Sequence, residues 1–168
     1  MRGRCYMYFQ EYKRALYDFS AALRADVNGS PSDIADYYMY AGQCNQYLGQ
    51  YEEALAHYNE GINKNTDSGE LYFHRGLAHV SLTNFQEGIR NFALAAKYTQ
   101  PTDPNRFRIL LNWGINLRRV NSLSESIEHL RKAIELQPGK PQAHNNLGLS
   151  YYEQNDPEEA AVHFTKAI

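Results

Sequence analysis

The chain has 168 residues, of which 43% are hydrophobic and 21% are charged, so it has the composition of an ordinary soluble protein and enough apolar residues for a core. A formal net charge of -2 gives no general attraction to nucleic acid or to anionic membranes, and we expect neither as a partner. The sequence lacks a signal-peptide core and an apolar run near the roughly 18 residues of a membrane span, so we expect a cytoplasmic protein, with the cytoskeleton or a cilium as alternatives.

Taken in chain order, the first recurring feature is a glycine, with spacings of 39, 34, 38 and 34 residues: Gly3, Gly42, Gly76, Gly114 and Gly148. Twelve positions after each comes a small residue: Ala15, Ala54, Gly88, Ser126 and Ala160. Four positions later comes a large apolar residue: Phe19, Tyr58, Phe92, Leu130 and Phe164. Two helices approach closely only where one lacks bulk, so the small residues predict a close crossing of two helices. The large residue is expected to fill the wedge between successive helix pairs.

The last of these units reads as L-G-x-x-Y followed by A-x-x-x-F-x-x-A, with Leu147, Gly148 and Tyr151 and then Ala160, Phe164 and Ala167. This pattern resembles a tetratricopeptide repeat, a family in which it recurs about every 34 residues. The resemblance implies an all-α fold, an α-solenoid in which helix-turn-helix repeats form a right-handed superhelix. We predict a single array over residues 1–168, with approximate repeats at 1–29, 35–68, 69–102, 107–140 and 141–168. The first and last repeats are incomplete, which predicts a part of a longer chain or of a multi-protein complex.

Two junctions are longer than the family period and contain turn-forming residues, at 28–31 and 101–104. Asn28 belongs to the first of these turns. Ser30 or Asp103 could cap a first helix that is longer by about one turn.

The two cysteines, Cys5 and Cys44, occupy the same position in the first two repeats, two residues after the glycine. The other repeats have Ala78, Asn116 and Ser150 there. We therefore expect both cysteines to be small core residues; a disulfide or metal pair is the alternative.

The sequence contains no recognisable catalytic pattern: no G-x-S-x-G, no phosphate-binding loop and no zinc motif among its six histidines and two cysteines. We therefore predict a protein that is not an enzyme and that needs no metal or cofactor.

In the resembled family, first helices line a concave inner groove, to which positions near the glycine contribute. The resemblance implies that a peptide or protein ligand binds there, and we predict that the groove is lined by Tyr40, Gln43, Phe73, His74, Arg108, Asn112, Asn145 and Asn146. Leu77, Leu111 and Ile115 would add apolar pockets. The set does not match the basic clamp with which some family members hold carboxyl-terminal tails of chaperones, since only Arg108 fits. Met1 lies two positions before Gly3, as Tyr40 does before Gly42, and is the equivalent residue of the first repeat.

Asn112 and Asn146 are one repeat apart, which is similar to the asparagine ladder of O-linked N-acetylglucosamine transferases. Amide side chains both donate to and accept from a peptide backbone. We predict a non-catalytic scaffold for protein-protein interaction that holds a peptide segment of a partner. The alternatives are a substrate-recognition arm of a larger enzyme and a structural part of a large assembly, such as a ciliary or transport complex.

Overall fold

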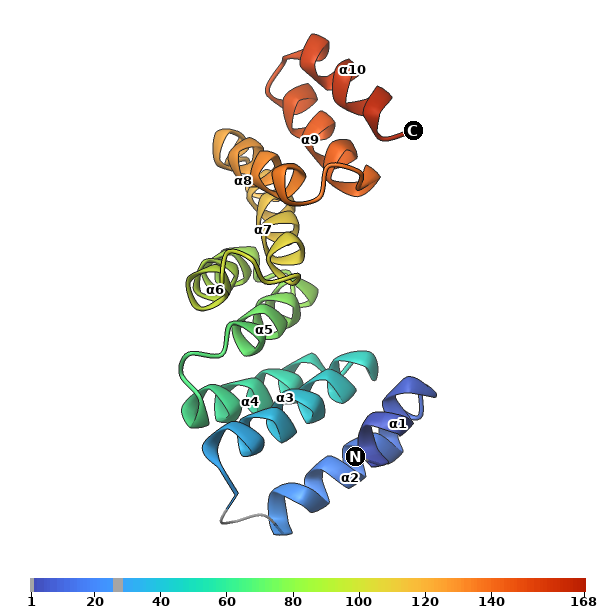
Figure 1. The fold of residues 1–168 in the computed structure, drawn as a ribbon, viewed down its shortest axis with the longest axis vertical. Helices are drawn as coiled ribbons and strands as arrows, with labels where there is room; N and C mark the ends of the chain where they lie inside the picture. The colour runs from blue at the N-terminus through green and yellow to red at the C-terminus, as the bar shows by residue number, and fades with distance from the viewer. Residues whose placement is uncertain (1, 26–28) are drawn as a thin grey trace. The chain divides into compact units, whose positions relative to one another are not determined.

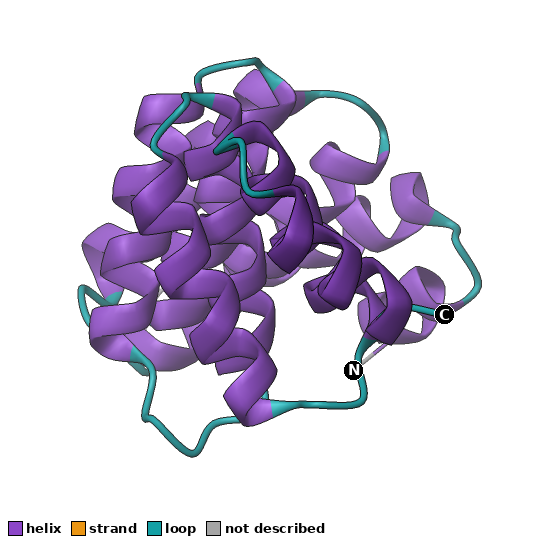
Figure 2. Ribbon diagram, turned by 90° about the horizontal axis from the view of Figure 1, so that it is seen from above, coloured by secondary structure: helices purple, strands orange, loops and turns teal. Residues whose placement is uncertain are grey.

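A computed structural model describes residues 2–25 and 29–168, and all regular secondary structure in these residues is helical (Figure 2). The predicted all-α fold is therefore confirmed. The chain divides into two compact units, Met1–Asn84 and Phe85–Ile168, which are treated separately below. The predictions for Met1 and Asn28 fall outside the described residues.

Each unit contains five described helices (Figure 1). The first unit contains α1 (Arg2–Tyr8), α2 (Tyr12–Ala25), α3 (Pro31–Tyr47), α4 (Tyr51–Lys64) and α5 (Gly69–Ser81). The second contains α6 (Phe85–Tyr98), α7 (Arg106–Arg119), α8 (Leu123–Leu136), α9 (Pro141–Glu153) and α10 (Pro157–Lys166). Within each unit every helix packs on the helices before and after it, as expected of a repeat protein.

In the repeats that lie within one unit, the recurring glycine lies where the two helices of the repeat cross. A β-carbon at Gly42 would lie 2.5 Å from the Tyr58 ring, and one at Gly114 would lie 2.6 Å from Cγ of Leu130. The large apolar residue of the second helix therefore packs directly on the glycine of its own repeat, in addition to its expected contact with the next repeat. Leu130 makes both contacts, because it also belongs to a cluster with Leu147 and Tyr151 of the following repeat.

The turn between the two helices of each repeat has one residue in the left-handed conformation, always seven positions after the glycine. The φ values at these positions lie between 60° and 76°: Gln10, Gly49, Thr83, Asn121 and Asn155. Only one of the five is a glycine, the residue type that adopts this conformation without steric cost.

The two longer junctions differ in structure. Ser30 caps α3 by accepting a hydrogen bond from the Asp33 N–H at 3.1 Å, and α3 is longer than the other first helices, as predicted. The same expectation for Asp103 is wrong. Its carboxylate accepts from the Asn105 N–H at 2.7 Å within the loop, and α7 begins only at Arg106.

The two cysteines are free thiols in different surroundings. Cys44 is buried, in a cluster with Ala15 and Phe19 of the preceding repeat, as expected. Cys5 is exposed, so the prediction of a core residue is wrong there. Burial of this position depends on the second helix of a preceding repeat, and the described residues before Cys5 supply none.

No helix in the described ranges is long and apolar enough to cross a membrane.

Candidate functional site

The eight predicted groove residues all lie on first helices, four in each unit. Tyr40 and Gln43 are on α3, and Phe73 and His74 are on α5. Arg108 and Asn112 are on α7, and Asn145 and Asn146 are on α9. The two sets are described separately.

In the first unit, Gln43 and His74 connect successive first helices through a hydrogen bond of 2.9 Å between Nε2 of Gln43 and Nε2 of His74. An amide nitrogen only donates, so in this bond Nε2 of His74 accepts from Gln43. The His74 ring also stacks on Tyr58, with 6.1 Å between centroids. These two residues therefore fix the relative position of α3 and α5.

Tyr40 is half-buried, and its ring packs between two other side chains. It stacks on Phe19, with centroids 5.2 Å apart, and the Arg4 guanidinium lies 5.4 Å from its centroid. Burial raises the pKa of the Tyr40 hydroxyl. The phenol is thus neutral at physiological pH, and its hydroxyl can donate a hydrogen bond.

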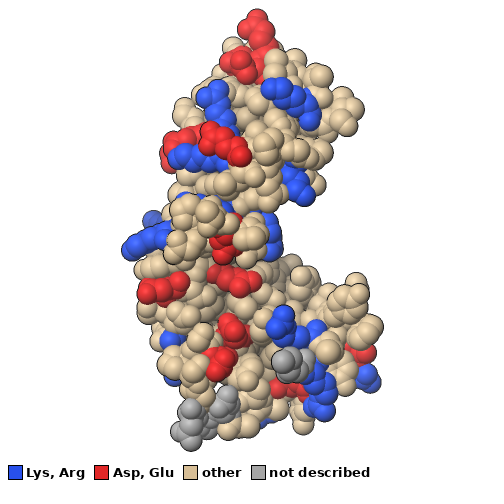
Figure 3. Space-filling view, in the orientation of Figure 1, with Lys and Arg blue, Asp and Glu red and all other residues tan. Residues whose placement is uncertain are grey.

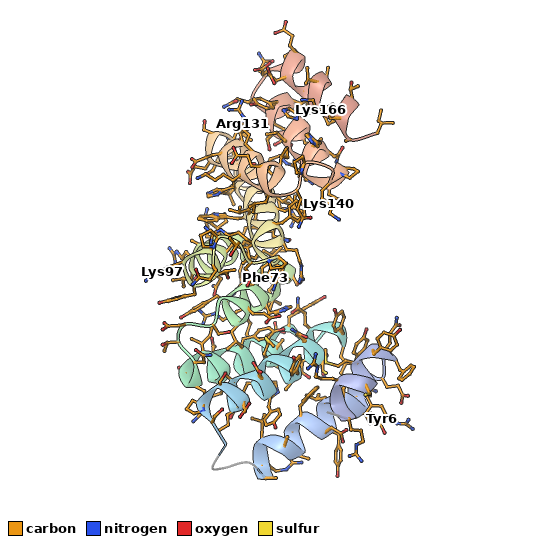
Figure 4. All side chains as sticks on the ribbon, viewed as in Figure 1. Tyr6, Phe73, Lys97, Arg131, Lys140 and Lys166 are labelled. Carbon is orange, nitrogen blue, oxygen red and sulfur yellow. The ribbon has the colours of Figure 1, made fainter. Side chains whose placement is uncertain are left out.

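Phe73 does not line an accessible surface, so its prediction as a ligand-contacting side chain is wrong. Its ring is only 3% exposed and meets the His74 ring edge-on at 5.4 Å (Figure 4 marks its position on α5). Met39 occupies the equivalent position on α3 and is also buried, whereas Asn145 on α9 is exposed. An apolar side chain at this position, three residues before the glycine of the repeat, packs into the core, where its burial stabilises the fold by roughly 2 kcal/mol.

In the second unit, Asn112 and Asn146 have the same geometry. Nδ2 of Asn112 donates to the Arg108 carbonyl at 2.8 Å, and Nδ2 of Asn146 donates to the Gln142 carbonyl at 2.8 Å. Each bond joins residues four positions apart on the same helix, so it holds each side chain against its helix. Each amide has a second N–H and an acceptor oxygen beyond this bond. This N–H can donate to a backbone C=O of an extended peptide, and this oxygen can accept from a backbone N–H.

Arg108 and Asn145 are both exposed, and they flank these amides in sequence. The Arg108 guanidinium lies 3.5 Å from Oδ1 of Asn105, a distance at the limit of hydrogen bonding. The polar face of α7 and α9 therefore combines amides with one cation.

Asp36 and Glu70 were not among the predicted site residues, yet they occupy the Arg108 column, six positions before the glycine. Both are exposed. Partial desolvation of the Asp36 carboxyl and the neighbouring Asp33 raise its pKa, while Arg4 opposes that change. Their position in the repeat was a sufficient signal to include them. The first unit is therefore acidic where the second carries Arg108.

Among the residues that the structure describes, no three His, Cys, Asp or Glu side chains are placed to hold a metal ion.

Comparison with known families matches most of the chain to repeats of one kind. Of two family models described as "Tetratricopeptide repeat", one matches residues 1–63 and the other residues 146–168; a third, described as "TPR repeat", matches residues 47–82 and 117–155.

Two curated proteins share moderate sequence identity with the chain. Sperm-associated antigen 1 of Mus musculus is 25% identical over 101 residues, which are 60% of this chain but 11% of that protein. Photosystem I assembly protein Ycf3 of Cuscuta gronovii is 31% identical over 113 residues, which are 61% of this chain and 67% of that protein. The chain thus spans only a small part of the first relative.

Solved structures show the same fold at lower sequence identity. The crystal structure of MamA has a TM-score of 0.85 at 21% identity and covers 98% of this chain and 91% of its own. That of YrrB, described as a TPR protein with an unusual peptide-binding site, has a TM-score of 0.79 at 23% identity and covers 99% and 81%.

Proposed function

Because this chain belongs to the tetratricopeptide repeat family, we propose that it is a non-catalytic scaffold that holds an extended peptide segment of a partner protein along its first helices. Repeats of this family mediate protein-protein interactions.

The observation that carries the proposal is the matched pair of amides, Asn112 and Asn146. Each is held against its helix by the same 2.8 Å bond. A side chain that is ordered before binding loses less conformational entropy when a ligand arrives. The remaining N–H and oxygen of each amide would then bond the backbone of the ligand, largely independently of its side chains.

Charge sets a preference among ligands. Arg108 is exposed one helical turn before Asn112 on α7. We expect the segment held by the second unit to carry an acidic side chain near this guanidinium, because a carboxylate and a guanidinium form the strongest hydrogen bonds of this kind.

The relatives are consistent with a role in holding other polypeptides. YrrB is described by its peptide-binding site, and Ycf3 is a photosystem I assembly protein. We propose the same general activity here, in the cytoplasm, with a partner of the stated chemistry.

The test uses a phage-displayed library of unstructured peptides selected on the 168-residue chain, followed by titration calorimetry with the best peptide. The variant Asn112→Ala with Asn146→Ala is expected to weaken binding by about 10- to 100-fold, since each lost bond is worth about 1 kcal/mol. Asn63→Ala, at an exposed asparagine on α4, is the matched control and should bind normally.

A second series separates backbone recognition from side-chain recognition. N-methylation of single backbone amides of the peptide should weaken binding at the positions that face Asn112 and Asn146, whereas alanine at those positions should be tolerated. Undiminished affinity of the double variant would refute the proposed site.

A further inference from the structure

Two histidine rings of the last helix pair are bonded to each other. Nδ1 of His144 on α9 lies 3.1 Å from Nδ1 of His163 on α10, and the ring centroids are 5.4 Å apart. His144 is only 7% exposed, and its other nitrogen, Nε2, lies 3.1 Å from the carbonyl oxygen of Pro138. The histidine pair therefore connects α10 to α9, and His144 also connects α9 to the loop that precedes it.

These two bonds limit the number of protons that the histidine pair can carry. A carbonyl oxygen only accepts, so Nε2 of His144 is protonated in its bond to Pro138. A hydrogen bond places one proton between its two nitrogens, so only one of the two Nδ1 atoms is protonated while the rings are bonded. Only Nε2 of His163 can then gain a further proton. Two neutral imidazoles carry two N–H groups in total, so the bonded pair is either neutral or singly charged.

The charged and titratable groups around the pair come from three helices. On α10, Oε2 of Glu159 lies 4.0 Å from Nε2 of His163, and Lys166 is the nearby cation. On α9, the Tyr151 ring stacks on His163 with 5.7 Å between centroids, and Arg131 of α8 donates to the Tyr151 hydroxyl. Figure 4 labels Arg131 and Lys166, and Figure 3 shows acidic side chains where α10 begins.

These surroundings favour a neutral His163 ring. Burial is the main cause that lowers the pKa of His163, and the proximity of His144 and Lys166 lowers it further. Arg131 acts in the same direction, whereas Glu159 opposes the change. One added proton can therefore be placed next to the Glu159 carboxylate, but a second charge on the pair meets cations on two sides.

We propose that the histidine pair is a pH switch: when acid charges both rings, the bond between them breaks and the contact of α10 with α9 opens. In that state both Nδ1 atoms carry protons, so two donors face each other and neither can accept. Two like charges this close together also repel each other. This inference does not depend on peptide binding.

Two other repeats have a histidine at the same position and provide a comparison. His57 and His129 lie fifteen positions after their glycines, as His163 does. The His57 ring lies 6.1 Å from that of Tyr38, and His129 stacks on Trp113. These ring contacts involve no second imidazole, so protonation of either histidine breaks no bond of the kind that joins α10 to α9.

The first experiment measures amide hydrogen exchange of the 168-residue chain at about pH 7 and about pH 5, expressed as protection factors so that the intrinsic effect of pH is removed. The protection of α10 should fall in acid by more than about tenfold relative to that of α8, because the open contact exposes its amides. In His163→Gln the fall should be at most about twofold, since an amide can donate to a neutral His144 and accept from a charged one.

Two further variants complete this experiment. His129→Gln is the matched control, because it removes a histidine at the same position of the preceding repeat, and it should show the full fall in α10 protection. His163→Phe has a ring of similar size but cannot form the bond, so it should lower the protection of α10 at both pH values. Far-UV circular dichroism checks that every variant is folded.

The second experiment follows the imidazole nitrogens of His144 and His163 by NMR as the pH is lowered. The pair should take up its protons in two steps separated by at least about one pH unit, because the first proton opposes the second. In His163→Gln, His144 should titrate in a single step.

An α10 protection that is the same at both pH values overturns the proposal. So does an equal fall in the unchanged chain and in His163→Gln, which would assign the acid effect to other groups. Titration of both histidines together, at the midpoint of a free histidine, overturns it as well, since rings that respond independently share no bond.

Discussion

Gly114 and Leu130 are in direct contact where α7 crosses α8, so closely that a β-carbon at Gly114 would lie 2.6 Å from Cγ of Leu130 and 3.2 Å from the Ser126 carbonyl oxygen. Leu130 is fully buried and cannot move aside. The crossing distance is thus set by the absence of one methyl group.

We predict that Gly114→Ala lowers the free energy of unfolding by about 1–3 kcal/mol, the usual cost of overpacking. Gly148→Ala should cost less, because its neighbour Phe164 is only half-buried and its ring can rotate. Gly139→Ala is the control, since no atom lies within 4 Å of a β-carbon there. Urea unfolding followed by circular dichroism measures all three. Equal stability of the Gly114 and Gly139 variants would contradict the close crossing.

Thr83→Gly is expected to stabilise the protein by about 0.5–1 kcal/mol. Thr83 has a φ of 61°, where a β-branched side chain is strained by about 1–2 kcal/mol, and glycine removes most of that strain at some entropic cost. Asn121→Gly is the matched comparison at a φ of 62° and should change stability less, because asparagine tolerates this conformation. Thermal unfolding of the two variants side by side tests the difference; a larger gain at Asn121 would contradict it.

Stability should fall as the pH drops from about 7 toward 5, because the unfolded histidines, with pKa values near 6.5, then bind protons that the fold resists. Burial lowers the pKa of His57, His129 and His163 in the folded protein. The stability that their neutral rings contribute is fully present above the unfolded pKa and is lost as pH falls through the folded values. The triple His→Gln variant should show a smaller difference between urea unfolding at the two pH values. The same difference in both proteins would assign the effect to other groups.

The single tryptophan reports on one of these histidines. Trp113 stacks on His129, with 3.7 Å between ring centroids. Burial is the main cause that lowers the pKa of His129, and nearby Lys132 adds to it. A protonated imidazole quenches indole fluorescence, so we predict that Trp113 emission falls with acid at a midpoint below the ordinary histidine pKa. His129→Gln should remove this titration, and a midpoint above that of a free histidine would be inconsistent with the buried stack.

The sequence predicted those parts of the fold in which the residue type itself determines the local structure. At Gly42, Gly114 and Gly148 any side chain would collide with the opposite helix, so the amino acid reveals the crossing. The left-handed turns escaped prediction, because Gln10 and Thr83 carry no sign of a conformation that is imposed by the two helices around them.

The predictions for single residues agree less well with the structure. The position of a residue within a repeat determines where it lies on its helix but not which side chains surround it. Phe73 was assigned to the groove, yet its ring is buried. Cys5 was assigned to the core, yet it is exposed. The bond between Gln43 and His74 depends on two side chains 31 positions apart, a pairing that a column-by-column reading does not contain.

Because each helix within a unit packs mainly on its sequence neighbours, the contacts that stabilise the unit close short loops of chain. Such local topology favours rapid folding, since little loop entropy is lost before contacts form. The same topology affects mechanical stability. A force applied to the two ends of a unit would unfold its helix pairs one after another instead of breaking many contacts at once, so each unit should extend gradually under load.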